Sequence, residues 1–172
     1  MTREQLKKIA IHATDKNIDK YLNYLNGYMH EYNICGRLRE SAFLATIIHE
    51  SGSFVYTKEI ASGQAYEGRK DLGNNQIGDG VRFKGRGLIQ LTGRDNYLKA
   101  SQAIGVNFIL NPELLETPQY AVQVSCWWWR KHGCNELADT QDIEAVTRRV
   151  NGGLNGIADR KKWYNLALEV LR

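Results

Sequence analysis

Apolar residues recur at helical spacing in the first part of the chain, and each stretch opens with a polar capping residue. Thr2 and Gln5 stand three residues apart, which is the spacing of a capping box, and they predict a short helix at the N-terminus. A second helix is expected after Thr14 and Asp15. Its apolar face comprises Ile18, Tyr21, Leu22 and Leu25. Both segments have the pattern of packing helices.

A third helix is predicted over residues 36–50. The run Ser51-Gly52-Ser53 that follows favours a helix end. Glu50 is therefore expected at the C-terminal end of this helix. The apolar face of the helix consists of Phe43, Leu44, Ile47 and Ile48.

The helical periodicity weakens from residue 53 to residue 87, where seven glycines punctuate a polar segment. A connection of this length is unusual unless it carries function. After it, we expect a short strand over residues 88–92, with Gln90 and Thr92 on one face and Ile89 and Leu91 on the other. One face would pack and the other would remain available to a ligand.

The rest of the chain predicts further helices, each with a capping residue at its start and two with proline at the first position. These starts are Asn111-Pro112, Thr117-Pro118 and Asp139-Thr140. No repeat or linker interrupts the chain, so we expect residues 1–172 to form a single, mainly α domain with a small β element. The long loop is expected to line a cleft.

Composition and charge narrow the possible partners. A net charge of +4 and a pI near 8.9 suit polyanionic partners, but the basic residues are spread along the chain, which argues against a nucleic-acid-binding arm. The number of cysteines, three, is odd, which argues against a complete disulfide framework and favours folding in a reducing cytoplasm. The charged N-terminal segment has no signal-peptide pattern. The sequence also contains no apolar run of about 18 residues, the length needed to span a membrane.

The candidate chemistry lies at Glu50 and Glu59, beside the glycine-rich segment. Hydrolysis of a glycosidic bond needs two carboxyl groups, one that donates a proton and one that activates water. The end of a helix disfavours a second negative charge, and burial against Phe54 or Tyr56 would act in the same direction, so we expect a protonated Glu50. A carboxylic acid that keeps its proton near neutral pH can act as a general acid.

Other chemistries find little support in the sequence. His49 has no second histidine four residues later, and no cysteine pair has short spacing, so we expect a hydrogen-bonded structural histidine and no metal site. The run Gly85-Arg86-Gly87 does not continue as a dinucleotide fingerprint. We expect no cofactor, because carboxylates fill both catalytic roles. The consecutive residues Trp127, Trp128 and Trp129 point about 100° apart and cannot form one flat platform for a sugar.

Several motifs in the same order carry a family resemblance that covers roughly residues 37–172. They are His49-Glu50-Ser51-Gly52, Tyr66-Glu67-Gly68-Arg69, Gly78-Asp79-Gly80, the run from Lys84 to Tyr97, and Val150-Asn151-Gly152-Gly153. Together they resemble glycoside hydrolase family 19, and within it the phage and prophage endolysins. The resemblance implies an α+β lysozyme-like fold and cleavage of an amino-sugar polymer.

The resemblance also implies residue roles. Glu50 matches the general acid of the family and Glu59 its general base, acting by an inverting mechanism. Glu67 is the rival base, unless Arg69 holds it in a structural ion pair. Arg160 resembles the arginine that pairs with the base, which would keep Glu59 ionised. The other positions that match cleft-lining or substrate-positioning residues are Tyr66, Arg86, Gln90, Thr92, Asn96, Tyr97 and Asn151. One departure is Ser53, which stands where many relatives have a second glycine.

Three functions from different classes remain open. The first is an endolysin that cuts the β-1,4 bonds of bacterial peptidoglycan, as a monomer made in the host cytoplasm that reaches the wall through a membrane lesion formed by another protein. The second is a chitinase, with the same carboxyl pair and different sugar subsites. The third is a non-catalytic module that binds cell wall or nucleic acid. The intact glutamates and the absence of repeated binding motifs favour an enzyme.

Overall fold

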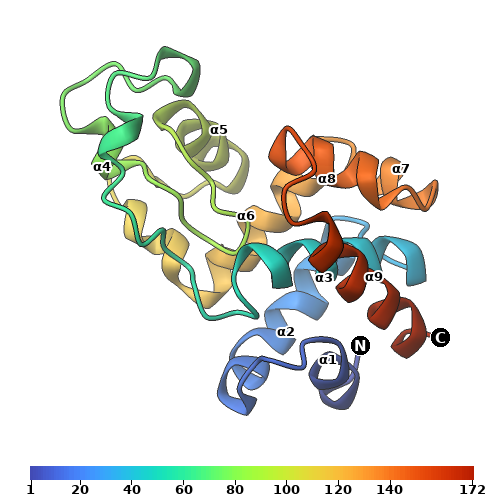
Figure 1. Ribbon diagram of the computed structural model, residues 1–172. Helices are drawn as coiled ribbons and strands as arrows, with labels where there is room; N and C mark the ends of the chain where they lie inside the picture. Colours follow the sequence, from blue (N-terminus) through green and yellow to red (C-terminus); the bar gives the residue numbers. More distant parts are fainter.

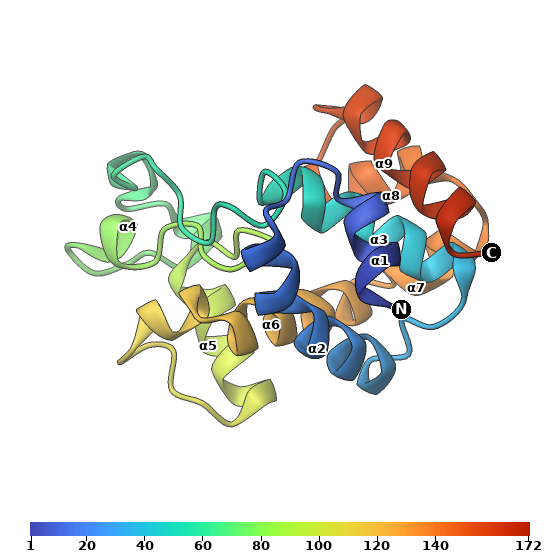
Figure 2. The same ribbon diagram turned by 90° about the horizontal axis from the view of Figure 1, so that it is seen from below.

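The computed structural model describes all 172 residues and consists almost entirely of helices and turns. Figures 1 and 2 show a larger helical part, which holds both termini, and a smaller part built from α4, α5 and long loops. The helices are α1 (Arg3–Ile9), α2 (Asp15–Glu31), α3 (Arg37–Glu50), α4 (Asp79–Arg82), α5 (Arg94–Ile104), α6 (Pro118–Lys131), α7 (Cys134–Asp139), α8 (Ile143–Asn151) and α9 (Ile157–Val170), with 3-10 helices η1 (Gln64–Tyr66), η2 (Lys70–Leu72) and η3 (Pro112–Glu116).

The core of the larger part forms around α3. All residues from Ser41 to Ile48 are buried, so this helix is covered on every side, as expected for a central helix. A single cluster of 27 buried residues joins α3 to α1, α2, α6, α7, α8 and α9. The C-terminal end of α3 faces the smaller part in both views (Figures 1 and 2), and this is where Glu50 lies.

The smaller part has its own core of seven buried residues. The rings of Phe83 and Tyr97 meet edge to face within it, 5.1 Å apart at their centroids. Helix α6 supplies Val124 to this core and Trp129 to the larger one, and Trp128 packs against both. One helix thus ties the two parts together.

Most of the predicted helix boundaries are confirmed. Thr2 and Gln5 form the capping box of α1, and the side chain of Thr14 caps α2 by accepting the N–H of Asn17. The start predicted at Asp139-Thr140 is wrong, because α7 ends there. The side chain of Asp142 caps the next helix instead.

The predicted strand over residues 88–92 is also wrong. Residues 87–90 form a turn, with Gly87 and Gln90 at positive φ, and Arg86 and Leu91 on either side of it exchange two backbone hydrogen bonds. The small β element consists only of isolated bridges, from Arg86 to Leu91 and to Lys58. The predicted segregation of faces still holds, since Ile89 and Leu91 are buried while the polar residues between and after them are partly exposed. No helix is both long and apolar enough to cross a membrane.

Candidate active site

Glu50 is the last residue of α3, and its side chain forms an ion pair with Arg160 from the first turn of α9. Arg160 is 1% exposed, and its Nε and Nη1 atoms have no hydrogen-bond partner. The expected pairing of Arg160 with Glu59 is therefore wrong, because the guanidinium reaches Glu50 instead. The expectation of a protonated Glu50 was argued from the helix end and from burial, and it did not include the Arg160 guanidinium that the structure places against this carboxyl group.

The residue before Glu50 has a partner of its own. His49 Nδ1 lies 2.7 Å from Asp159 Oδ2, and the indole Nε1 of Trp163 donates to the same oxygen over 2.9 Å. Burial raises the pKa of Asp159, but the hydrogen bonds from His49 and Trp163, together with the charges of His49 and Lys162, give a net downward shift. His49 is thus the hydrogen-bonded histidine that the sequence predicted. Asp159 was missed, although its position next to Arg160 mirrors that of His49 next to Glu50.

The loop after α8 also contacts this end of α3. A Cβ atom added to Gly156 would lie 2.3 Å from the imidazole of His49, so the loop backbone packs directly on the ring and requires glycine. Gly156 also has φ +72, which favours glycine. Asn151 ends α8 and is exposed, with a long hydrogen bond of 3.4 Å to the carbonyl of Asn155. The loop that follows Asn151 is therefore anchored at His49, next to Glu50.

Glu59 lies on the loop that crosses to the smaller part, and both of its carboxylate oxygens are held. The hydroxyl of Tyr66 donates to Oε1 over 2.9 Å, and the N–H of Gly85 donates to Oε2 over 3.1 Å. The backbone N–H of Glu59 donates in turn to the Gly85 carbonyl over 2.9 Å. Burial and the neighbouring Glu59 raise the pKa of Tyr66, so its hydroxyl remains a donor. The structure places Tyr66 against the carboxylate, where sequence analysis had predicted a substrate contact.

Gly85 brings further predicted residues to the same place. A Cβ atom there would lie 2.8 Å from Gln90 Oε1, 3.3 Å from Glu59 Oε2 and 3.4 Å from Thr92 Oγ1. The three side chains therefore converge on one glycine, and all are partly exposed. Asn96 follows on α5 and donates to the carbonyl of Thr92 over 2.8 Å. Gln90 and Thr92 thus lie with Glu59 beside Gly85, and Asn96 supports the backbone of Thr92.

Two predicted substrate-binding residues are buried instead. Tyr97 is fully buried, which raises its pKa to about 12, and its hydroxyl donates to the Lys84 carbonyl over 2.6 Å. Arg86 is 7% exposed and donates to Tyr97 Oη over 3.0 Å and to Glu116 over 2.8 Å. Both side chains are buried and form hydrogen bonds within the protein. Their expected contact with substrate is therefore wrong, and they support the backbone of residues 84–86.

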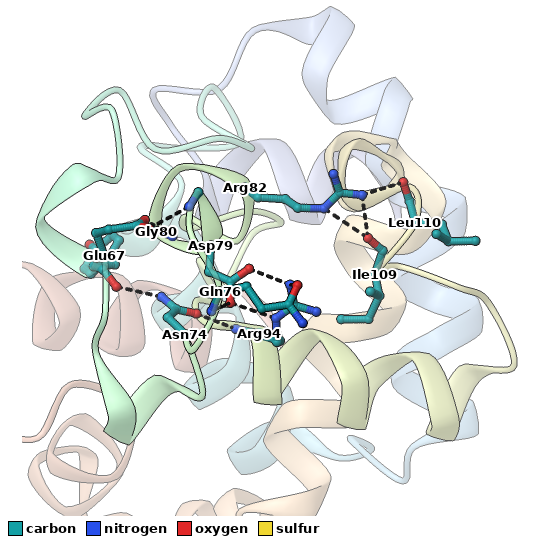
Figure 3. Close-up of polar contacts among 11 residues, drawn as sticks. Glu67, Asn74, Gln76, Asp79, Gly80, Arg82, Arg94, Ile109 and Leu110 are labelled. Atoms are coloured by element: carbon teal, nitrogen blue, oxygen red, sulfur yellow. Dashed lines mark hydrogen bonds and ion pairs between the residues drawn. The ribbon is translucent and has the colours of Figure 1, made fainter.

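Glu67 organises a turn of the long loop. Its two oxygens accept the N–H groups of Gly78, over 2.6 Å, and Gly80, over 2.8 Å, at the start of α4 (Figure 3). Arg69, which had been considered as its partner, pairs with Asp71. Both acceptor oxygens of Glu67 are thus used to fix backbone.

A second network completes the frame of this loop. The buried carboxylate of Asp79 receives two hydrogen bonds from Arg94 of α5, and Asn74 joins the Tyr66 carbonyl to the Arg94 N–H (Figure 3). The Arg94 guanidinium holds the pKa of Asp79 below its usual range.

The long loop lines two surface hollows, and neither includes Glu50 or Glu59. One lies between residues 76–79, Arg82, Arg94 and residues 109–110, and the other lies along residues 67–77. The long loop thus lines hollows, but neither of them contains the carboxyl pair. Both glutamates remain partly exposed, although Arg160 contacts Glu50 and both Tyr66 and Gly85 donate to Glu59.

The helical frame and the two partly exposed glutamates suit a glycosidase of the lysozyme-like class, and comparison with known proteins gives the family. The model of the chitinase class I family, glycoside hydrolase family 19, matches residues 39–150. A family 19 domain-containing protein of Haemophilus influenzae is 32% identical over 160 residues, which cover 74% of this chain and 78% of the relative. The chain belongs to glycoside hydrolase family 19 and is a chitinase-like glycoside hydrolase.

Other relatives are longer. An endochitinase of Arabidopsis thaliana is 36% identical over 114 residues, which cover 66% of this chain and only 39% of that protein. Among solved structures, chitinase C of Streptomyces griseus superposes with a TM-score of 0.80 at 22% identity, covering 99% of this chain and 76% of that chain. A class IV chitinase of Zea mays gives 0.69 at 24% identity, covering 100% and 82%. These superpositions confirm the expected fold.

Proposed function

We propose that this chain hydrolyses the β-1,4 bonds of the bacterial peptidoglycan glycan strand by an inverting mechanism. Glu50 protonates the leaving oxygen and Glu59 activates the water. Arg160 stabilises the carboxylate that Glu50 becomes after it gives up its proton. Tyr66 and Gly85 hold Glu59 in one orientation, so that its free lone pairs can take a proton from water.

Glu59 is favoured over Glu67 as the base by its surroundings. Glu59 shares the neighbourhood of Gly85 with Gln90 and Thr92, whose polar groups suit sugar hydroxyls and amides. Glu67 instead bonds the backbone of Gly78 and Gly80. Of the two carboxylates, Glu59 is therefore the one with polar side chains beside it that suit a sugar.

The choice of peptidoglycan rests on Lys84. Its Nζ donates to the carbonyl of Ala61 over 2.9 Å, so the ammonium lies beside the Glu59 loop, and it forms no ion pair with a carboxylate. Arg82, two residues earlier, likewise bonds only the carbonyls of Ile109 and Leu110. The uncompensated Lys84 ammonium near the base favours a polymer that carries carboxylates, as peptidoglycan does on its lactyl and peptide groups, over uncharged chitin.

A comparison of substrates tests this choice. Reducing ends released from purified peptidoglycan and from chitin oligomers would be measured for the wild type, Lys84→Gln and the control Lys70→Gln, an unpaired lysine of the same loop. We expect Lys84→Gln to lower kcat/KM on peptidoglycan by about threefold to tenfold, with chitin oligomers unaffected. Equal losses on both substrates would contradict the charge argument.

Chitin hydrolysis is the second candidate, and the relatives named as endochitinases favour it. Cleavage of chitin oligomers by a wild type that leaves peptidoglycan intact would establish this activity in place of the proposed one.

Access to the wall is part of the proposal. As an endolysin, the enzyme would be made in the host cytoplasm and would reach its substrate only after another protein opens the membrane. Expression in bacterial cells should then cause lysis only when a membrane-permeabilising agent is added. Lysis at the same rate without that agent would contradict this route.

A further inference from the structure

The last turn of α6 places aromatic surface next to solvent. Trp129 points into the core, where its Nε1 donates to Asn135 Oδ1 over 2.9 Å. Trp127 and Trp128 remain partly exposed. The ring of Trp128 stacks on His132 one turn later, with centroids 3.9 Å apart and planes inclined by 19°.

Basic residues from three helices act on this end of α6. Lys131 lies 4.9 Å from the centroid of the Trp127 ring, and Arg149 of α8 donates to the His132 carbonyl. Lys99 belongs to α5. Burial lowers the pKa of His132, the hydrogen bond to the Trp128 carbonyl raises it, and the positive charges of Lys131, Arg149 and Lys99 lower it, so that the net shift is downward. Helix α6 runs between the part that carries α5 and the part that carries α8 (Figures 1 and 2).

None of these three cations forms an ion pair with a carboxylate. Their sequence neighbours are paired: Arg130 bonds Glu136 over 2.7 Å, and Arg148 lies 3.5 Å from Glu144. Glu144 also pairs with Lys161. The positive charges of Lys99, Lys131 and Arg149 are therefore available to an anionic ligand.

We infer that the cation-aromatic cluster of Lys99, Trp127, Trp128, Lys131, His132 and Arg149 is a second binding site for an anionic glycan, separate from Glu50 and Glu59. Sugar rings pack on the exposed indole surface, while carboxylates or phosphates of the polymer pair with the three cations. The inference rests on the proposed action on peptidoglycan. A second attachment to the same polymer raises the local concentration of strand at the catalytic pair.

Binding measurements in the inactive Glu50→Gln background test the cluster without cleavage. Sedimentation with purified peptidoglycan sacculi would compare Lys99→Gln/Lys131→Gln with Lys8→Gln/Lys16→Gln, a control pair of exposed, unpaired lysines on α1 and α2. We expect the cluster pair to weaken binding about tenfold and the control pair less than about twofold. The difference should vanish at about 1 M salt, because screening removes the attraction.

Two further arms identify the anionic group. Sacculi freed of phosphate polymers keep their carboxylates, so a difference that persists on them assigns the carboxylates, and one that disappears assigns the phosphates. Chitin, which is neutral, should show no difference between the two pairs.

Three results would overturn the inference: equal weakening by both pairs on sacculi, no weakening by either, or an equal loss for the cluster pair on duplex DNA, which would indicate general polyanion binding. The proposed function can fail separately. A wild type that cleaves only chitin, with cluster-dependent binding to sacculi intact, would leave this site standing. Cleavage of peptidoglycan without cluster-dependent binding would remove only the second site.

Discussion

Glu50 and Arg160 are 110 residues apart in sequence, and their side chains form an ion pair at the junction of α3 and α9. The adjacent residues His49 and Asp159 form a second pair over 2.7 Å. Two consecutive residues at the end of α3 thus meet two consecutive residues in the first turn of α9. This double contact fixes the backbone that carries the proposed general acid.

Replacing the arginine should separate activity from stability. We expect Arg160→Met to lower kcat on peptidoglycan by about 10²-fold, because the carboxylate formed on Glu50 loses its partner. The free energy of unfolding should change by less than about 1 kcal/mol, because two buried donors of Arg160 already lack partners and the Glu50 side chain is 22% exposed. Kinetics and urea denaturation measure the two quantities. A loss of several kcal/mol would show that Arg160 is mainly structural.

The contact between His49 and Asp159 should fix the orientation of Glu50. In Asp159→Asn, we expect kcat to fall about tenfold or more with KM nearly unchanged, because a small displacement of the acid affects the reaction more than binding. Trp163→Phe is the control, since it removes one donor to Asp159 and leaves the contact with His49. A parallel rise in KM, or an equal effect of Trp163→Phe, would argue against a positioning role.

The turn after Glu50 contains avoidable backbone strain. Ser53 has φ +60 between Gly52 and Phe54, which are also at positive φ, and serine takes this conformation at a cost. We expect Ser53→Gly to stabilise the protein by about 0.5–1 kcal/mol. Ser41→Gly, the same replacement inside α3, should destabilise it by about 1 kcal/mol. A destabilising Ser53→Gly in thermal denaturation would refute the strain argument.

The stability of the fold should depend on pH through Asp79, which lies in the long loop. Its pKa is lowered by Arg94, so this pair stabilises the fold fully above the unfolded value near 3.8, and the contribution is lost as the pH falls through the folded value. We expect Asp79→Asn to cost about 1.5–3 kcal/mol at pH 7. The difference from the wild type should shrink at pH 3. Asp71→Asn, at an exposed pair, should match the wild type at both values, and a constant deficit for Asp79→Asn would exclude ionisation as its cause.

Local signals made the helices predictable. Thr2 and Thr14 cap their helices with side chains that act within three residues, so the sequence contains the whole interaction. Near residue 140 several capping residues compete, and local sequence could not decide that Asp142 rather than Asp139 starts α8. Gly87 and Gln90 at positive φ replaced the expected strand by a turn, and the alternation of apolar and polar residues does not report backbone φ.

Sequence motifs indicated the candidate site residues, but the roles expected for some of them were wrong because tertiary contacts determine where those side chains lie. The pairing of Arg160 depends on how α9 packs against α3, which no local pattern specifies. Tyr97 shares the buried face of α5 with Ala100, three residues later, so helical periodicity could have indicated an inward direction. Arg86 is buried because Tyr97 and Glu116 surround it, and neither contact is visible in the glycine-rich motif.

The most direct test of the catalytic pair is the rate of reducing-end release from purified peptidoglycan by the wild type and the Glu50→Gln, Glu59→Gln and Glu67→Gln variants. The new reducing sugar would be identified by mass spectrometry. We predict losses of about 10²–10⁴-fold for Glu50→Gln and Glu59→Gln, with folding unchanged, and substantial activity for Glu67→Gln. Undiminished release by Glu59→Gln, together with loss in Glu67→Gln, would contradict the account and assign the base to Glu67.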